Sequence, residues 1–268
     1  IMAAVEFEHN NHIAIVTLNR PEARNAMNPE VMVGMFDAFQ EIENNNDIRV
    51  AILTGTGDKA FCAGADLGQL IPLMTGSRGP ENEWDDRFLS EVSQQGSYLM
   101  SRDTVKPVVA AINGHAIAGG MELVQGTDLR VAVPSAKFGL QEVKWAIFPA
   151  GGSTVKLNRQ IPYAKAMELM LTGDLITAEE AFDYGFLNYV VEPNELMNKA
   201  MELAEKLAGN GPIAVQAIRK SVREVWGRPE KEGLAMESKF SAPVFQSEDA
   251  IEGPKAFMEK RTPVYKGR

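Results

Sequence analysis

The sequence of 268 residues has little cysteine and little histidine: one cysteine, Cys62, and three histidines, His9, His12 and His115. A single cysteine forms no intrachain disulfide and excludes a cluster of thiolate ligands. Because a histidine-rich metal site is equally unexpected with so few histidines, we predict a protein without a bound metal ion.

Long apolar runs and an excess of positive charge are also missing. No apolar stretch approaches the roughly 20 residues that cross a bilayer, and the N-terminal residues alternate with acidic ones instead of forming a basic and then apolar signal. The 27 Lys+Arg against 36 Asp+Glu give a net charge of -9, which opposes broad attraction to nucleic acid. We therefore expect a cytoplasmic protein with neither a membrane nor a nucleic acid as partner.

The residues that are present form an alternation of strand-like and helix-like segments. Residues 49–53 and 108–112 are short β-rich runs that lead into glycine-rich loops, and residues 128–133 repeat the pattern. Asn28 followed by Pro29 predicts a helix start, after which apolar residues recur at helical spacing to residue 42. The predicted class is α/β.

Two irregularities divide the chain. Residues 67–91 are rich in glycine and proline and predict a loop, with a helix over residues 84–100. A capping-box pattern at Thr177 to Glu180 predicts another helix. Beyond Pro193 the pattern becomes helical, so we expect a core of residues 1–192 that holds the active site and a helical region of residues 193–268.

Two glycine-rich turns predict exposed backbone amides. Gly64 permits a tight turn that leaves the Ala65 amide pointing into a cavity, and Gly119 begins a helix whose first amides have no intrahelical acceptor. Two such N–H groups converging on one point would make an oxyanion hole. The plainer interpretation of either glycine cluster is an ordinary turn.

Two glutamates accompany these turns. Glu122 lies in the first turn of the helix that starts at Gly119, and Glu142 follows the strand-like Phe138 and Gly139. Glu122 could simply complement the helix dipole and Glu142 could be a solvated loop acid. Their apolar neighbours favour burial instead, which would raise the pKa of at least one carboxyl toward neutrality and allow an acid and a base to coexist.

Other catalytic motifs are not satisfied. The segment around Gly119 lacks the Gly-x-Gly-x-x-Gly order, and residues 55–59 lack the Walker spacing. No Gly-x-Ser-x-Gly elbow appears, so a serine hydrolase is disfavoured and His115 is interpreted as structural.

Taken together, the motifs resemble those of the crotonase (enoyl-CoA hydratase/isomerase) family over nearly the whole chain. The matching segments are residues 19–21, 25–28, 63–66, 113–122, 128–130, 138–142 and 149–152. The resemblance implies a spiral of repeated ββα units with a C-terminal helical trimerisation region, assembled as a homotrimer or as a homohexamer built from two trimers. It also implies a lyase that acts on coenzyme A thioesters, with no cofactor beyond the CoA moiety of the substrate.

The resemblance also implies roles for individual residues. Ala65 and Gly119 match the oxyanion-hole amides, and Glu122 and Glu142 match the two acids that hold a water over the Cα=Cβ bond. The loop containing Ala63, Asp66 and Leu67 would receive the adenine end of CoA. Arg24 and Lys59 would contact its phosphates, although a solvated surface role is the alternative for each.

The acyl group is predicted from fewer residues. Met121, Trp145 and Phe148 would form a compact wall suited to a short or sulfur-bearing tail, with core packing as the alternative. The chain is similar in spacing and length to methylthioacryloyl-CoA hydratases, whose hydrated product collapses to methanethiol and an aldehyde with release of CoA. The leading hypothesis is therefore a hydratase that adds water across the Cα=Cβ bond of a short-chain 2-enoyl-CoA thioester. The hypotheses that compete with it are a double-bond isomerase, a CoA-binding or RNA-binding scaffold without catalysis, and a Clp-type serine peptidase.

Overall fold

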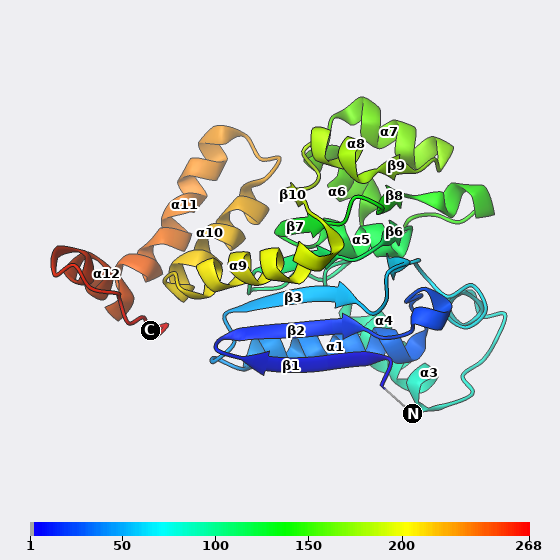
Figure 1. Ribbon diagram of the computed structural model, residues 1–268, viewed down its shortest axis with the longest axis horizontal. Helices are drawn as coiled ribbons and strands as arrows, with labels where there is room; N and C mark the ends of the chain where they lie inside the picture. The colour runs from blue at the N-terminus through cyan, green and yellow to red at the C-terminus, as the bar shows by residue number, and fades with distance from the viewer. Residues whose placement is uncertain (1–2) are drawn as a thin grey trace.

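The computed structural model describes residues 3–268, in which two β-sheets form the framework (Figure 1). The larger sheet has the strand order β1 (Val5–Asn10), β2 (Ile13–Leu18), β3 (Val50–Gly55), β5 (Val108–Ile112), β7 (Leu129–Ala132) and β10 (Tyr189–Val190). The smaller sheet has the order β4 (Ala60–Cys62), β6 (His115–Ile117), β8 (Lys137–Gly139) and β9 (Ile176–Thr177).

The chain passes from one sheet to the other in a repeating pattern. β3, β5 and β7 in the larger sheet are each followed by β4, β6 and β8 in the smaller one. A helix comes after each pair: α2 (Leu70–Met74), α5 (Gly119–Gln125) and α6 (Ser153–Gln160). Successive strands pair in parallel in both sheets, so the ββα units stack as a spiral. The predicted α/β spiral is confirmed.

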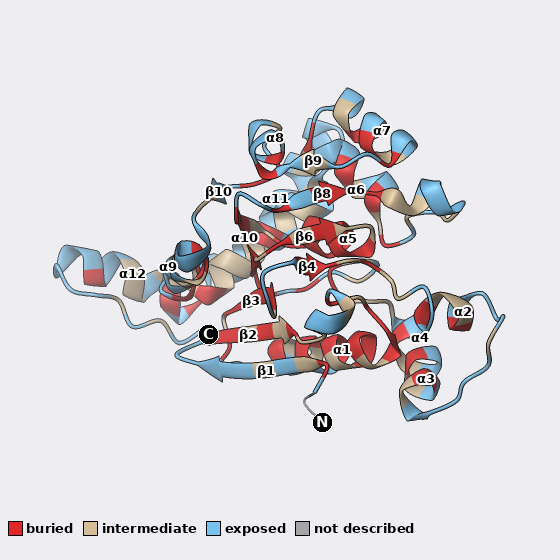
Figure 2. Cartoon of the chain, turned by 45° about the vertical axis from the view of Figure 1, so that its right-hand side comes forward, coloured by how far each residue is buried: buried red, intermediate tan, exposed pale blue. Residues whose placement is uncertain are grey.

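The core lies where helices cover the larger sheet. Every residue of β3 and β5 is buried, as expected of parallel strands packed on both faces. α1 (Pro29–Asn44) packs against β1 and β2, and α9 (Leu196–Ala208) packs across β3, β5 and β7. α1 begins as predicted, because the Asn28 side chain accepts a hydrogen bond of 3.0 Å from the Val31 amide. Figure 2 shows β2, β3 and α1 largely in the colour of buried residues, whereas the edge strand β1 is largely in the colour of exposed ones.

The segment between β4 and β5 is more helical than the sequence indicated. It contains α2, then α3 (Glu83–Arg87), a π-helical turn (Phe88–Val92) and α4 (Ser93–Gln95). The predicted helix over residues 84–100 is wrong beyond Gln95. Gly96, at φ 85°, ends it, and residues 97–102 form a turn. The helix predicted from the capping box is α8 (Ala178–Asp183), preceded by α7 (Tyr163–Thr172).

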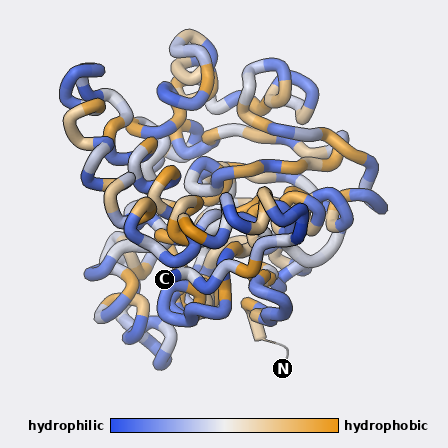
Figure 3. The backbone as a smooth tube through the Cα atoms, turned by 90° about the vertical axis from the view of Figure 1, so that its left-hand side faces the viewer, coloured by the Kyte–Doolittle hydropathy of each residue, from blue (hydrophilic) through white to orange (hydrophobic). Residues whose placement is uncertain are grey.

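Helices also dominate the end of the chain. After a 3₁₀ turn (Pro193–Glu195) come α9, α10 (Pro212–Val225), α11 (Glu230–Phe245) and α12 (Glu248–Met258). The last two helices extend away from the sheets (Figure 1), and in Figure 3, where this side faces the viewer, hydrophobic stretches alternate with hydrophilic ones. Because α9 packs on the larger sheet, a boundary at residues 192/193 stays a prediction. No helix in residues 3–268 is long and apolar enough to cross a membrane.

Candidate active site

The two predicted amide donors lie side by side. A Cβ built on Gly64 would stand 3.2 Å from the Gly119 nitrogen, and one built on Gly119 would stand 3.6 Å from the Ala65 nitrogen. Within residues 3–268 neither the Ala65 nor the Gly119 amide donates a hydrogen bond to a protein acceptor. Two unused N–H groups at one point are able to bind a developing oxyanion.

The backbone around these amides is held by specific contacts. The Met27 amide donates to the Gly64 carbonyl and the Asp66 amide donates to the Met27 carbonyl, both at 2.8 Å, which fixes the loop on either side of Ala65. Ala118, the residue before α5, has φ 52° and ψ −125°, a conformation that costs on the order of 1–3 kcal/mol for a non-glycine residue. Its amide donates to the Gly139 carbonyl at 2.8 Å, and this bond helps hold the turn that directs the Gly119 amide.

Glu122 is the more deeply buried acid. Its side chain in the first turn of α5 is 3% exposed, and its Oε1 accepts a hydrogen bond of 3.2 Å from the Ser153 amide at the start of α6. Burial raises the pKa of Glu122, and the hydrogen bonds from Ser153 and Gly151 partly offset that rise. The glycine turn that precedes α6 therefore orients the carboxyl group.

Glu142 comes from a different element, the 3₁₀ helix Gln141–Trp145. Among the described residues its Oε2 is buried and has no hydrogen-bond partner. Burial raises the pKa of Glu142 to about 7, and the negative charge of Glu122 adds to the rise. A buried carboxyl oxygen without a partner is available to bind water or substrate.

Both glutamates and both amide-bearing residues line one cavity of about 340 Å³. Most of its remaining wall is apolar, a composition typical of small-molecule sites with a few convergent polar groups. Four methionines from separate segments contribute to it: Met27, Met32, Met74 and Met100. No sequence spacing connects these four residues, and the sequence reasoning missed them.

Two of the three residues of the predicted acyl wall line the cavity, and their contact with an acyl group stays a prediction. Trp145 and Phe148 line the cavity, and each is 65% exposed. The prediction for Met121 is wrong, because its side chain is fully buried in the hydrophobic core and does not line the cavity. Adjacent residues on a helix point about 100° apart, so Met121 and Glu122 face different surroundings.

The residues of the predicted CoA-binding loop also differ in where their side chains lie. Ala63 and Leu67 line the cavity. The Asp66 carboxylate instead pairs with Arg20 at 3.1 Å and accepts the amides of Gly68 and Gln69, so its side chain holds the loop. Arg24 and Lys59 are exposed and do not line this cavity, and their contact with phosphate stays a prediction.

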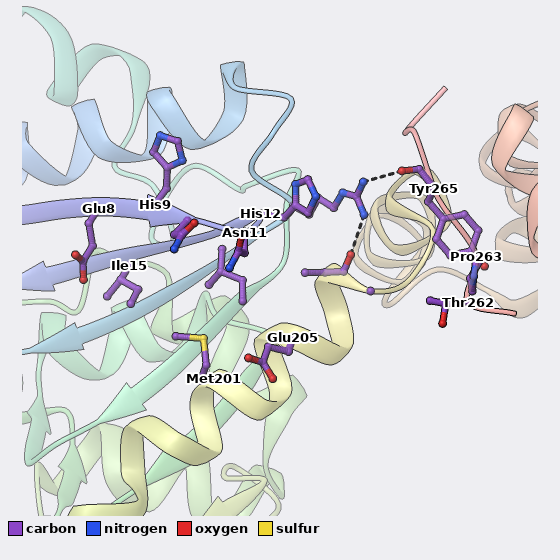
Figure 4. A pocket seen from close by; sticks show the side chains of 15 residues that line it. Glu8, His9, Asn11, His12, Ile15, Met201, Glu205, Thr262, Pro263 and Tyr265 are labelled. Carbon is purple, nitrogen blue, oxygen red and sulfur yellow. Dashed lines mark hydrogen bonds between the residues drawn. The ribbon is translucent and has the colours of Figure 1, made fainter.

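A larger cavity of about 580 Å³ lies between the β1–β2 hairpin, α9 and the C-terminal residues Thr262 to Tyr265 (Figure 4). Arg49 crosses it and donates to the Ala208 and Tyr265 carbonyls at 3.0 and 2.8 Å. Neither Glu122 nor Glu142 lines this larger cavity, so the smaller cavity is the candidate active site. In the part of the chain that the structure describes, no three His, Cys, Asp or Glu side chains gather as metal ligands.

Known proteins resemble this chain over its whole length. The family described as enoyl-CoA hydratase/isomerase matches residues 8–268. Enoyl-CoA hydratase EchA19 of Mycobacterium tuberculosis is 46% identical over 97% of this chain and 96% of its own, and the short-chain-enoyl-CoA hydratase of Clostridium acetobutylicum is 37% identical over 96% and 95%. The crystal structure of an enoyl-CoA hydratase from M. tuberculosis H37Rv superposes with a TM-score of 0.89 at 39% identity and covers 100% of both chains.

Proposed function

The chain belongs to the enoyl-CoA hydratase/isomerase family, and from this membership we propose that it adds water across the Cα=Cβ bond of short-chain 2-enoyl-CoA thioesters. It is an enzyme of the lyase class that acts on coenzyme A thioesters. The observation that carries the proposal is the meeting, in one cavity, of two unused amides with the buried Glu122 carboxyl and the half-buried Glu142 carboxyl, both with raised pKa values.

In the proposed reaction the thioester oxygen accepts hydrogen bonds from the Ala65 and Gly119 amides. These bonds strengthen as negative charge moves onto that oxygen in the enolate, and each such donor typically contributes about 2.7–4 kcal/mol to transition-state stabilisation. Because both amides belong to the fixed backbone, little reorganisation accompanies the chemical step.

Glu122 and Glu142 hold the attacking water. The water oxygen forms a bond to Cβ while its proton passes to one carboxylate, and Cα receives a proton from the acid pair. The sum is one H and one OH added across the double bond. A raised pKa at both carboxyls supports this division, because one must be protonated while the other is ionised.

We further propose a short acyl tail, with 3-methylthioacryloyl-CoA among the substrates. Met27, Met32, Met74 and Met100 support this, since flexible thioether side chains pack well around small apolar or sulfur-bearing groups. The adenine end would lie at the loop from Ala63 to Leu67. No cofactor beyond the CoA moiety is proposed, so dialysis against EDTA should leave turnover unchanged.

The assembly we propose is a homotrimer or a homohexamer. Its support is a set of apolar side chains at the end of the chain that are more than half exposed: Leu234, Phe245, Ile251, Phe257, Met258 and Val264. Large apolar side chains exposed to water in this number favour a surface that other copies of the chain cover.

The proposed function is tested by following the enoyl-thioester absorbance of crotonyl-CoA and methylthioacryloyl-CoA, with thiol release as a second signal for the latter. Glu122→Gln and Glu142→Gln each keep the shape of the side chain and should lose at least about 100-fold in kcat, as expected for a general acid or base. Glu179→Gln, on the exposed first turn of α8, is the matched control. Unchanged turnover in both site variants would end the proposal.

The isomerase and scaffold alternatives give different results in the same assays. An isomerase shifts the double bond without taking up oxygen from ¹⁸O-labelled water, whereas a hydratase incorporates it at Cβ. A scaffold binds CoA thioesters without turnover, and an RNA-binding form would show salt-sensitive association with RNA.

A further inference from the structure

Lys156, on α6, reaches out of its helix to a distant turn. Its Nζ donates hydrogen bonds to the Leu99 carbonyl at 2.8 Å and to the Met100 carbonyl at 2.5 Å. Leu99 has φ 66°, an uncommon value for a branched residue, so this turn depends on outside contacts to keep its shape.

The same turn forms part of the cavity wall. Met100 lines the cavity. A Cβ on Gly151 would overlap both the Cε of Met100 and the Oε2 of Glu122. Lys156 itself lies against Gly152, where a Cβ would be 3.2 Å from its Cε. The start of α6 therefore binds Glu122 through the Ser153 amide and the Met100 turn through the Lys156 ammonium.

We propose that Lys156 is a positioning residue that fixes the acyl end of the cavity by holding the Leu99–Met100 turn against Gly151 and Glu122. This inference rests on the proposed function and deepens it. If the turn moves, the Met100 thioether no longer closes the cavity beside the carboxyl group, and longer acyl tails gain room.

The far end of this segment is held separately. Arg219, on α10, donates to the Thr104 carbonyl and pairs with Asp103 at 2.9 Å, and Arg223 pairs with Asp103 at 2.6 Å. These contacts secure residues 103–104 without reaching the cavity. The turn also has hydrogen bonds of its own, from the Met100 and Arg102 amides to the Ser97 carbonyl. The Lys156 ammonium adds the side-chain hydrogen bonds that tie its carbonyls to α6.

Charged groups on several elements face Lys156. Arg223 on α10 and Arg130 on β7 oppose its charge, while Asp103 and Glu122 favour it. Burial lowers the pKa of Lys156 to about 8, with Arg223 as the second cause. As pH rises through about 8, the Lys156 ammonium should therefore lose one proton, and with it the positive charge and one of its three N–H donors.

The test compares Lys156→Met and Lys156→Arg with the wild type and with Lys206→Met, an exposed lysine on α9 that is remote from the cavity. Crotonyl-CoA and 2-octenoyl-CoA are the two substrates. We expect Lys156→Met to lower kcat on crotonyl-CoA by up to about 100-fold, the effect of misplacing a reacting group by roughly 1 Å, and to reduce the preference for the shorter tail. Lys156→Arg should keep most of the wild-type kcat on crotonyl-CoA and most of the preference for the shorter tail. The pH profile of the wild type should fall on its alkaline side near pH 8, and this fall should be missing in Lys156→Met.

A purely structural lysine would give a different result. In that case Lys156→Met would lower the melting temperature but leave the tail preference and the pH profile as in the wild type, and the inference would be overturned. Calorimetric binding of butyryl-CoA and octanoyl-CoA, which cannot be hydrated, measures the same preference without catalysis. If the wild type turns over no enoyl-CoA, the proposed function is wrong. If Lys156→Met leaves the ratio of butyryl-CoA to octanoyl-CoA affinity unchanged, the inference about Lys156 is wrong.

Discussion

The Glu122 carboxyl occupies the space in which any side chain on Gly151 would begin, because a Cβ built there overlaps Oε2. Gly151→Ala should therefore displace Glu122 and the Met100 methyl group together. We expect a fall in kcat of about 100-fold on crotonyl-CoA, as for a catalytic group moved by roughly 1 Å. Gly151 does not have a positive φ, so the fold should be retained, and circular dichroism together with kinetics checks both expectations.

The control for this variant is Gly79→Ala, since a Cβ at Gly79 meets nothing within 4 Å and its φ is ordinary. It should behave as the wild type. Full activity in Gly151→Ala would mean that Glu122 has room to move without losing its function.

The residue before the Gly119 amide offers a test of backbone strain. Ala118→Gly should stabilise the protein by about 1 kcal/mol, because relief of roughly 1–3 kcal/mol of strain outweighs the ~0.5–1 kcal/mol entropic cost of glycine. Ala164→Gly, on an exposed position of α7, should instead destabilise it by about 0.5–1 kcal/mol. Urea unfolding measures both, and equal destabilisation would show that Ala118 is not strained.

The parts of the site that could be predicted from sequence are those with local signals. Gly64 with Ala65 and Gly119 with Glu122 each belong to a glycine turn next to a short strand, and the structure brings Ala65, Gly119 and Glu122 to the same cavity. The strand at residues 108–112 and the Asn28 cap were predictable for the same reason, since a few adjacent residues determine them.

The rest depends on contacts between distant segments. Met27 and Met100 lie far apart in the sequence, and it is the stacking of the ββα units that brings both to the cavity. Lys156 likewise contacts the Leu99 carbonyl across a long stretch of sequence. Met121 adjoins Glu122 in the sequence, yet helical geometry turns its side chain into the core. Sequence adjacency to a catalytic residue is thus weak evidence for a place in its pocket.

The raised pKa of Glu142 makes the stability of the protein depend on pH. Between the ordinary value of 4.5 and about 7 the folded state binds more protons than the unfolded state, so stability falls as pH rises through this window and stays lower above it. Glu142→Gln removes this dependence. Relative to the wild type, the variant should gain on the order of 1–2 kcal/mol between pH 5 and pH 8 after allowance for partial exposure. Urea unfolding at the two pH values measures it, and an equal difference at both would contradict the raised pKa.

The exposed apolar residues of α11 and α12 lead to a prediction about assembly. Phe245 and Phe257 are 81% and 82% exposed, which is unfavourable for an isolated chain and is relieved when copies of the chain cover them. Phe257→Glu should therefore shift the molar mass measured by light scattering from three or six chains toward one, because a buried unpaired charge opposes association. Phe182→Glu, at an exposed phenylalanine on α8, should leave the mass unchanged. A wild type that elutes as a single chain at micromolar concentration would refute the proposed assembly, whereas an assembled Phe257→Glu variant would place the interface elsewhere on the molecule.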